Sequence, residues 1–229
     1  MRAILSAELA ALIDLSAAVV GADETTLAGC LKRARADADP ERVEETILQS
    51  YLFLGFPAAL EAMKRWRELG GPVGDSDAGS EDLMGRLEDG PEETESWRER
   101  GEAVCRLVYG TNYEKLRANV EHIHPALDDW MVSEGYGKVL GRPGLDLTAR
   151  ELCIVAQLTA AQREVQLHSH LRGALNVGAT IGEVEASIRI GLQHVEQAEW
   201  DLRVEQLWWR VRERWQRSQQ RVDQDDESE

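Results

Sequence analysis

Residues 147–180 read LTARELCIVAQLTAAQREVQLHSHLRGALNVGAT, and their pattern indicates the fold class. Apolar residues recur in it at intervals of three and four, which is the spacing of one face of an α-helix. Thr148 is followed three residues later by Glu151, the pattern of a capping box. The sequence therefore predicts a helix that begins near Ala149.

Two more helices are expected to follow. Residues 160–162 are the predicted turn, and Gly178 is expected to end a second helix that begins near Arg163. Thr180 and Glu183 repeat the capping pattern and predict the next helix start. Helical spacing also runs through most of the remaining chain and strand-like alternation is hard to find, so we expect an all-α protein.

An internal repeat is visible when the predicted helices are aligned. Residues 5–7 resemble residues 147–149, and residues 43–47 resemble residues 184–188, in the same order. A chance match between two helical segments is the alternative, because the identity is low.

Charge marks the expected domain boundaries. Residues 70–96 hold nine acidic residues and one arginine among repeated Gly, Pro and Ser, which is typical of a flexible linker. The last eight residues carry five acidic residues and no basic one. We therefore divide the chain into a first repeat (1–69), an acidic linker (70–96), a second domain (97–217) and a disordered acidic tail (218–229).

Composition excludes several classes of function. The 229 residues carry a net charge of −16, which argues against nucleic-acid binding. The linker and the last eight residues account for most of that charge, so the folded part is nearly neutral. Cys30, Cys105 and Cys153 are odd in number and far apart, which does not suit a disulfide framework.

The N-terminal stretch resembles a secretion signal only in part. Residues 3–20 are mostly apolar, but Glu8 and Asp14 interrupt them. No segment approaches the length of about 20 apolar residues that spans a bilayer. We expect a cytoplasmic protein that does not bind membranes.

Glu151 and His170 are the candidate catalytic pair. If the two helices of residues 147–180 are antiparallel, Glu151 lies about 15 Å and His170 about 12 Å from the turn, so the side chains can face each other. A carboxylate that orients an imidazole is a plausible acid/base pair. A purely structural hydrogen bond between packed helices is the alternative.

The sequence predicts no metal site. His168 and His170 are two residues apart, so they point to nearly opposite sides of a helix. His122 and His124 have no carboxylate or thiol partner at ligand spacing. Cys153 lies in an apolar context, so we expect a buried structural thiol.

The last helical stretch is rich in tryptophan and arginine. It holds Trp200, Trp208, Trp209 and Trp215, four of the seven tryptophans of the chain. Stacking on nucleic acid and membrane-surface binding are alternatives, but an interface between subunits or domains suits this composition best.

Two segments carry a resemblance to a known family. Residues 135–152 (GYGKVLGRPGLDLTAREL) and residues 168–180 (HSHLRGALNVGAT) resemble the carboxymuconolactone decarboxylase family. The resemblance covers residues 97–217 in full and is weaker in the first half, chiefly at residues 48–61. The superfamily also contains the alkylhydroperoxidase D proteins.

The resemblance implies a helical alkylhydroperoxidase D-like fold and assembly into a homotrimer or another homo-oligomer. It implies a reaction without a cofactor on a small anionic organic substrate, which is a carboxylated lactone or a related acid. In that reaction His170 would transfer the proton, and Glu151 would orient the His170 side chain. Arg142, Arg150, Arg172 and His168 are the candidate substrate-binding residues.

The alternatives are a thiol-dependent peroxidase and a non-catalytic scaffold. In the peroxidase branch two cysteines precede the histidine, whereas this chain has Arg163 and Gln166 at those positions, so that pair cannot form a disulfide. In the first repeat the position of His170 falls on Cys30, and that of Glu151 falls near residues 9–11. That half is therefore expected to supply interface and pocket walls.

Overall fold

The computed structural model describes residues 4–71, 91–195 and 197–226, and every regular element in these ranges is a helix. The expected all-α fold is confirmed. In the first half the helices are α1 (Ala7–Ala18), α2 (Glu24–Asp37), α3 (Pro40–Gln49), α4 (Tyr51–Leu54) and α5 (Phe56–Glu68). The second half contains α7 (Pro91–Tyr109), η2 (Gly110–Asn112), α8 (Tyr113–Ile123), α9 (Pro125–Trp130), η3 (Met131–Leu140), α10 (Leu147–Ala160), α11 (Glu164–Asn176), α12 (Ile181–Leu192) and α13 (Ala198–Asp226).

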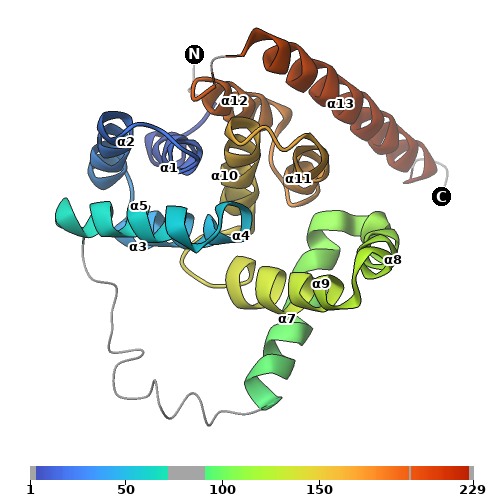
Figure 1. Cartoon of the computed structure of the whole chain (residues 1–229). Helices are drawn as coiled ribbons and strands as arrows, with labels where there is room; N and C mark the ends of the chain where they lie inside the picture. The colour runs from blue at the N-terminus through green and yellow to red at the C-terminus, as the bar shows by residue number, and fades with distance from the viewer. Residues whose placement is uncertain (1–3, 72–90, 196, 227–229) are drawn as a thin grey trace.

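Helix α10 is the centre of the fold (Figure 1). Every residue from Ala149 to Ala160 is buried, because α1, α11 and α12 pack around it. A helix that is buried on all sides needs apolar neighbours for its apolar residues and protein partners for its polar ones. One hydrophobic core therefore includes residues of both halves, from Leu12 of α1 to Val184 of α12.

The start of α10 differs from the sequence prediction. Asp146, not Thr148, caps the helix, because its Oδ1 accepts a hydrogen bond from the backbone N–H of Ala149 at 2.9 Å. The Thr148 hydroxyl donates instead to the Val177 carbonyl at 2.6 Å. Glu151 is thereby released from any capping role and turns into the protein interior.

The next two boundaries follow the prediction. The turn after α10 contains Gln162 with φ 56°, and Gly178 follows α11 with φ 102°. At the start of α12, Thr180 and Glu183 form the predicted reciprocal capping box. The loops are short, so α10 and α11 are antiparallel neighbours.

A buried ion-pair cluster joins the two halves. Glu45 of α3 accepts hydrogen bonds from Arg150 of α10 at 2.7 Å and from Arg142 at 3.0 Å. The Arg150 guanidinium also donates to the backbone carbonyls of Leu145 and Pro143. Arg150 is fully buried and all its hydrogen bonds serve this junction.

Helices α7 and η3 cross in backbone contact. A Cβ atom on Gly137 would lie 1.9 Å from the Trp97 carbonyl oxygen, and one on Gly101 would lie 2.0 Å from the Val132 carbonyl oxygen. Only glycine permits this approach at either position. The crossing brings Tyr109 and Tyr136 to one cavity, which is described below.

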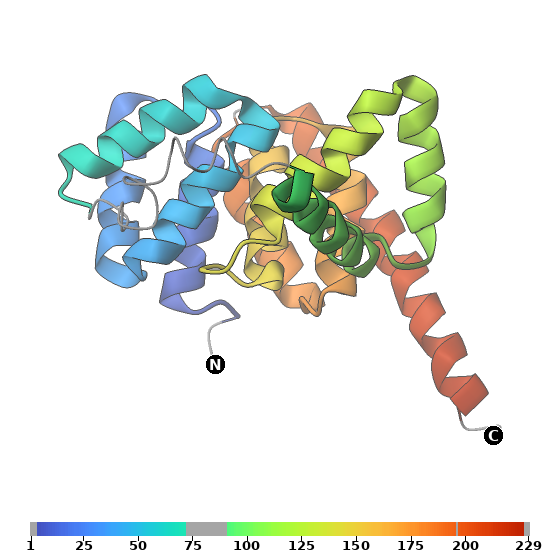
Figure 2. The ribbon, with the colours of Figure 1, turned by 90° about the horizontal axis from the view of Figure 1, so that it is seen from below.

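The expected linker and tail differ in part from the structure. Residues 72–90 lie outside the described residues, whereas residues 91–96 of the predicted linker belong to α7. The tail predicted to be disordered from residue 218 is helical through Asp226, because α13 continues through a run of Gln and Arg, which favour helix. The C-terminal part of α13 extends beyond the other helices (Figure 2).

Candidate active site

Glu151 and His170 meet inside the protein. Glu151 Oε2 lies 2.8 Å from His170 Nδ1. Glu151 is fully buried and His170 is 5% exposed. Since Nδ1 faces the carboxylate, Nε2 is the ring nitrogen left to meet a substrate.

Two features of Glu151 set it apart from a packing contact. Its Oε1 is buried and has no hydrogen-bond partner among the described residues. A buried carboxylate oxygen without a partner can accept a hydrogen bond from a bound molecule. Gly173 lies so close that a Cβ there would be 2.8 Å from Oε2, so glycine lets α11 approach the carboxylate.

His170 opens into a cavity of about 460 Å³. Most of the lining is apolar. The walls are formed by Tyr51, Leu52, Phe53, Tyr109, Leu127, Trp130, Met131, Glu134, Gly135, Tyr136, Leu140, Gln166 and His170. A small organic molecule fits a cavity of this size, and few polar groups are present to orient it.

Two tyrosines supply hydroxyl groups to the cavity. The Tyr136 hydroxyl donates to the Tyr109 hydroxyl at 3.1 Å, which leaves the Tyr109 proton available to a ligand. Burial raises the pKa of both phenols, and the charge of Glu151 contributes to the increase. The two groups are therefore neutral hydrogen-bond donors at physiological pH.

The first half contributes one wall, as expected. Phe53 packs edge-on against His170, with 5.4 Å between the ring centroids. Tyr51 donates a hydrogen bond to Glu134 Oε1 at 2.9 Å across the same cavity. Burial is the main cause that raises the pKa of the Tyr51 hydroxyl, and the hydrogen bond to Glu134 raises it further.

The three candidate arginines lie in three different places, and none lines the cavity of His170. Arg150 is buried in the ion pair with Glu45, so it has no access to a substrate. Arg142 lines a separate apolar groove with Phe56 and Leu60. Arg172 lines a smaller cavity of about 180 Å³, which shares Tyr109 with the larger one.

The other histidines are also separate from the cavity. Burial, together with the charges of Arg172, Arg214 and Arg210, lowers the pKa of the His168 side chain. His168 is thus within electrostatic range of Arg210 and Arg214 of α13 and is not among the residues that line the cavity of His170. His122 and His124 are exposed at the α8–α9 junction, where His124 caps α9.

All three cysteines are buried and free. Burial raises the pKa of Cys30, Cys105 and Cys153 to about 12 in each case. The expected structural role of Cys153 agrees with this burial. A thiol with such a pKa is almost entirely protonated at neutral pH and is a poor nucleophile.

Sequence reasoning missed Tyr109, Tyr136 and Phe53 as neighbours of His170. Tyr136 lies in one of the two segments that carry the resemblance and Phe53 in the weaker stretch at residues 48–61, but no local spacing relates either of them to His170. Their meeting depends on the packing of the first half and on the α7–η3 crossing.

Comparison with known proteins gives one match. Residues 125–198 match the family described as carboxymuconolactone decarboxylase, which confirms the resemblance for the segment from α9 to the start of α13. This segment contains Glu151 and His170. No curated protein and no solved structure matched the chain.

Proposed function

We propose that the segment of the carboxymuconolactone decarboxylase family in this chain carries out decarboxylase-type acid/base chemistry, without a cofactor, on a small organic acid. The observation that carries the proposal is the 2.8 Å contact between Glu151 and His170 at the wall of a cavity of about 460 Å³. The cavity weighs against a non-catalytic scaffold, since a packing pair needs no open space beside it.

His170 is the proposed proton-transfer group. Loss of carbon dioxide from a carboxylated lactone leaves the electron pair of the broken C–C bond in a delocalised dienolate. The imidazolium of His170 gives its Nε2 proton to a carbon of that dienolate and regains one from water. Glu151 holds the ring through Nδ1 and stabilises its positive charge.

The apolar lining suits a decarboxylation. A carboxylate placed among Leu52, Met131 and Leu140 loses much of its hydration, while the departing carbon dioxide is neutral and the dienolate charge is spread over several atoms. The Tyr109 hydroxyl and the Gln166 amide are the proposed donors to the dienolate oxygen. Arg172, in the adjoining cavity, is the proposed distant cation for an anionic substrate.

Thiol-dependent peroxide reduction is the weaker candidate. It would need a thiolate, and burial keeps all three cysteines protonated. Gln166 lines the cavity where the peroxidase branch has a cysteine, and glutamine has no redox chemistry.

Carbon dioxide release from a panel of small carboxylated lactones and related acids tests the proposal. The full chain is expected to release carbon dioxide from at least one member in buffer containing a chelator, and iodoacetamide treatment is expected to leave the rate unchanged. Peroxide reduction that iodoacetamide abolishes, with no carbon dioxide release, would support the thiol alternative instead.

A further inference from the structure

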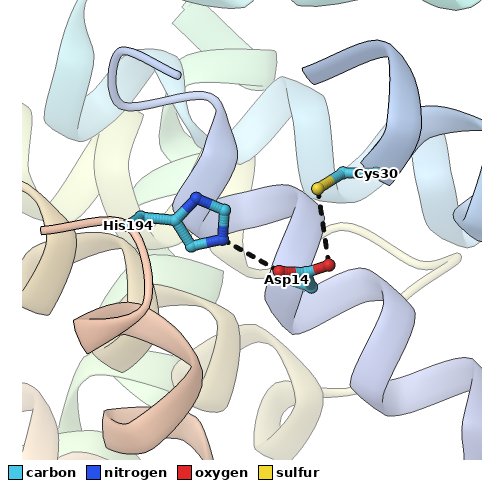
Figure 3. A group of neighbouring side chains, drawn as sticks. All are labelled: Asp14, Cys30 and His194. Carbon is cyan, nitrogen blue, oxygen red and sulfur yellow. Dashed lines mark hydrogen bonds and ion pairs between the residues drawn. The ribbon is translucent and has the colours of Figure 1, made fainter. Parts of the chain in front are cut away.

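A second polar cluster lies at α1 and α2, which are on the other side of α10 from α11 (Figure 1). It consists of Asp14 of α1, Cys30 of α2 and His194, which follows α12. His194 Nε2 lies 2.8 Å from Asp14 Oδ1, and Cys30 Sγ lies 3.4 Å from Asp14 Oδ2. Figure 3 shows the imidazole and the thiol on either side of the carboxylate.

We propose that Asp14, Cys30 and His194 bind one divalent transition-metal ion of the zinc class. One ligand atom from each of the three residues lies within 4.8 Å of the other two. Ligands that share a tetrahedral zinc ion stand about 3.5 Å apart, since the metal–ligand bonds are about 2.0–2.3 Å long. Small side-chain rotations therefore suffice to close the three residues around an ion.

The donor types select the metal. A thiolate, an imidazole and a carboxylate together suit Zn²⁺ or Co²⁺, whereas Mg²⁺ and Ca²⁺ prefer oxygen ligands. Asp14 and Cys30 are 7% and 5% exposed, so few water molecules compete with the protein ligands. The three residues leave a fourth coordination position for a water molecule.

Arg33 is the group that an ion must displace. Its Nη1 lies 2.6 Å from Asp14 Oδ2, but its side chain is 58% exposed and can turn into solvent. Binding replaces the guanidinium charge by the metal charge, and the Cys30 thiol releases its proton to water. The bound ion then faces two anionic ligands and one neutral imidazole.

The site has a structural consequence. His194 is 180 positions from Asp14 in the sequence. Of the three residues of the cluster, His194 comes from the second half and the other two come from the first. A bound ion would fix the end of α12 to α1 and α2. Any ligand that binds the folded state and not the unfolded state raises the stability of the fold.

The cluster also revises one expectation for the first half. The repeat alignment sets Cys30 opposite His170 but finds no carboxylate at residues 9–11. Asp14, about one turn further along α1, supplies that carboxylate. The sequence-based expectation of no metal site did not consider these three residues, because they lie too far apart in the chain to form a recognisable metal-ligand motif.

Metal binding by the chelator-treated full chain tests the proposal. With zinc chloride, isothermal titration is expected to give one ion per chain, and thermal denaturation is expected to show a higher Tm. With cobalt chloride, a thiolate-to-metal charge-transfer band is expected in the near ultraviolet. Cys30→Ser and His194→Gln are each expected to weaken binding at least about 10-fold, whereas Cys105→Ser and His122→Gln retain it.

Three results would overturn the proposal: no stoichiometric uptake by the wild type, a cobalt spectrum without the thiolate band, or unchanged affinity in both Cys30→Ser and His194→Gln. Circular dichroism checks that each variant is folded. The cobalt spectrum of the wild type decides the question even if a variant does not fold.

Discussion

Among the described buried carboxylates, Glu151 is the one without an arginine partner. Glu45 contacts Arg142 and Arg150, Asp128 contacts Arg117, and Asp14 contacts Arg33. The partner of Glu151 is His170, whose Nδ1 lies 2.8 Å from Glu151 Oε2. The carboxylate therefore acts on the imidazole through Nδ1 and fixes the orientation of the ring.

At the residue scale, Asp14 provides a pH-dependent prediction. Burial opposes its ionisation, but the hydrogen bonds of His194 and Cys30 and the charge of Arg33 lower its pKa below 3.8. A carboxyl group with a depressed folded-state pKa stabilises the fold above its unfolded pKa and loses that effect as the pH falls through the folded value. In metal-free buffer, Asp14→Asn should therefore lower Tm at pH 7, and the difference from wild type should shrink below about pH 4.

The exposed Asp37 at the end of α2 is the control, and Asp37→Asn is expected to change Tm little at any pH. A wild-type advantage over Asp14→Asn that stays constant from about pH 5 to pH 2.5 would refute the linkage.

At the scale of elements, the close approach of α10 and α11 depends on Gly173. A Cβ there would lie 2.8 Å from Glu151 Oε2 and 2.7 Å from Val108 Cγ1. Gly173→Ala is expected to lower the free energy of unfolding by about 1–3 kcal/mol and to disturb the pair of Glu151 and His170. Chemical denaturation together with the turnover rate measures both effects.

Gly29 of α2 is a matched control, since a Cβ there meets nothing within 4 Å. Gly29→Ala is expected to stabilise the chain by about 0.5–1 kcal/mol, because alanine is the better helix former. If both variants are equally stable, the tight contact at Gly173 has no energetic weight.

The sequence predicts the helices well and their contacts poorly. The three- and four-residue spacing and the capping box at Thr180 act locally, so α10, α11 and α12 could be placed within a few residues. The approach of Phe53 to His170 and of His194 to Asp14 depends on packing between segments far apart in the chain. No local pattern contains that information.

At the scale of the whole molecule, the two halves share one core and a buried ion-pair junction. Arg150 is fully buried, so its removal leaves Glu45 with one partner fewer and several carbonyls unpaired. Arg150→Met is expected to lower the free energy of unfolding by about 3–5 kcal/mol. The exposed pair of Arg217 and Glu213 is the control, and Arg217→Met should cost only about 0.5 kcal/mol.

Urea denaturation of both variants measures this difference. A folded, fully stable Arg150→Met variant with a raised KM would instead assign Arg150 to substrate binding.

None of the described helices is both long enough and apolar enough to cross a membrane.

Assembly into a homotrimer remains a proposal. Of the tryptophans of α13, Trp200 and Trp208 are buried in the chain's own core, whereas Trp209 is 55% exposed. Leu202 on the same helix is 59% exposed, which suits a contact between copies. Sedimentation equilibrium is expected to give a trimer for the wild type and smaller species for Trp209→Glu; a monomeric wild type would contradict the proposal.

The most direct test of the proposed function compares two histidines on one helix. His170 lines the cavity, whereas His168 lies two residues away and is not among the lining residues. His170→Gln is expected to reduce carbon dioxide release about 10²–10⁴-fold while the circular dichroism spectrum stays unchanged, and His168→Gln is expected to stay within a few-fold of wild type. Wild-type turnover by a folded His170→Gln variant would contradict the account.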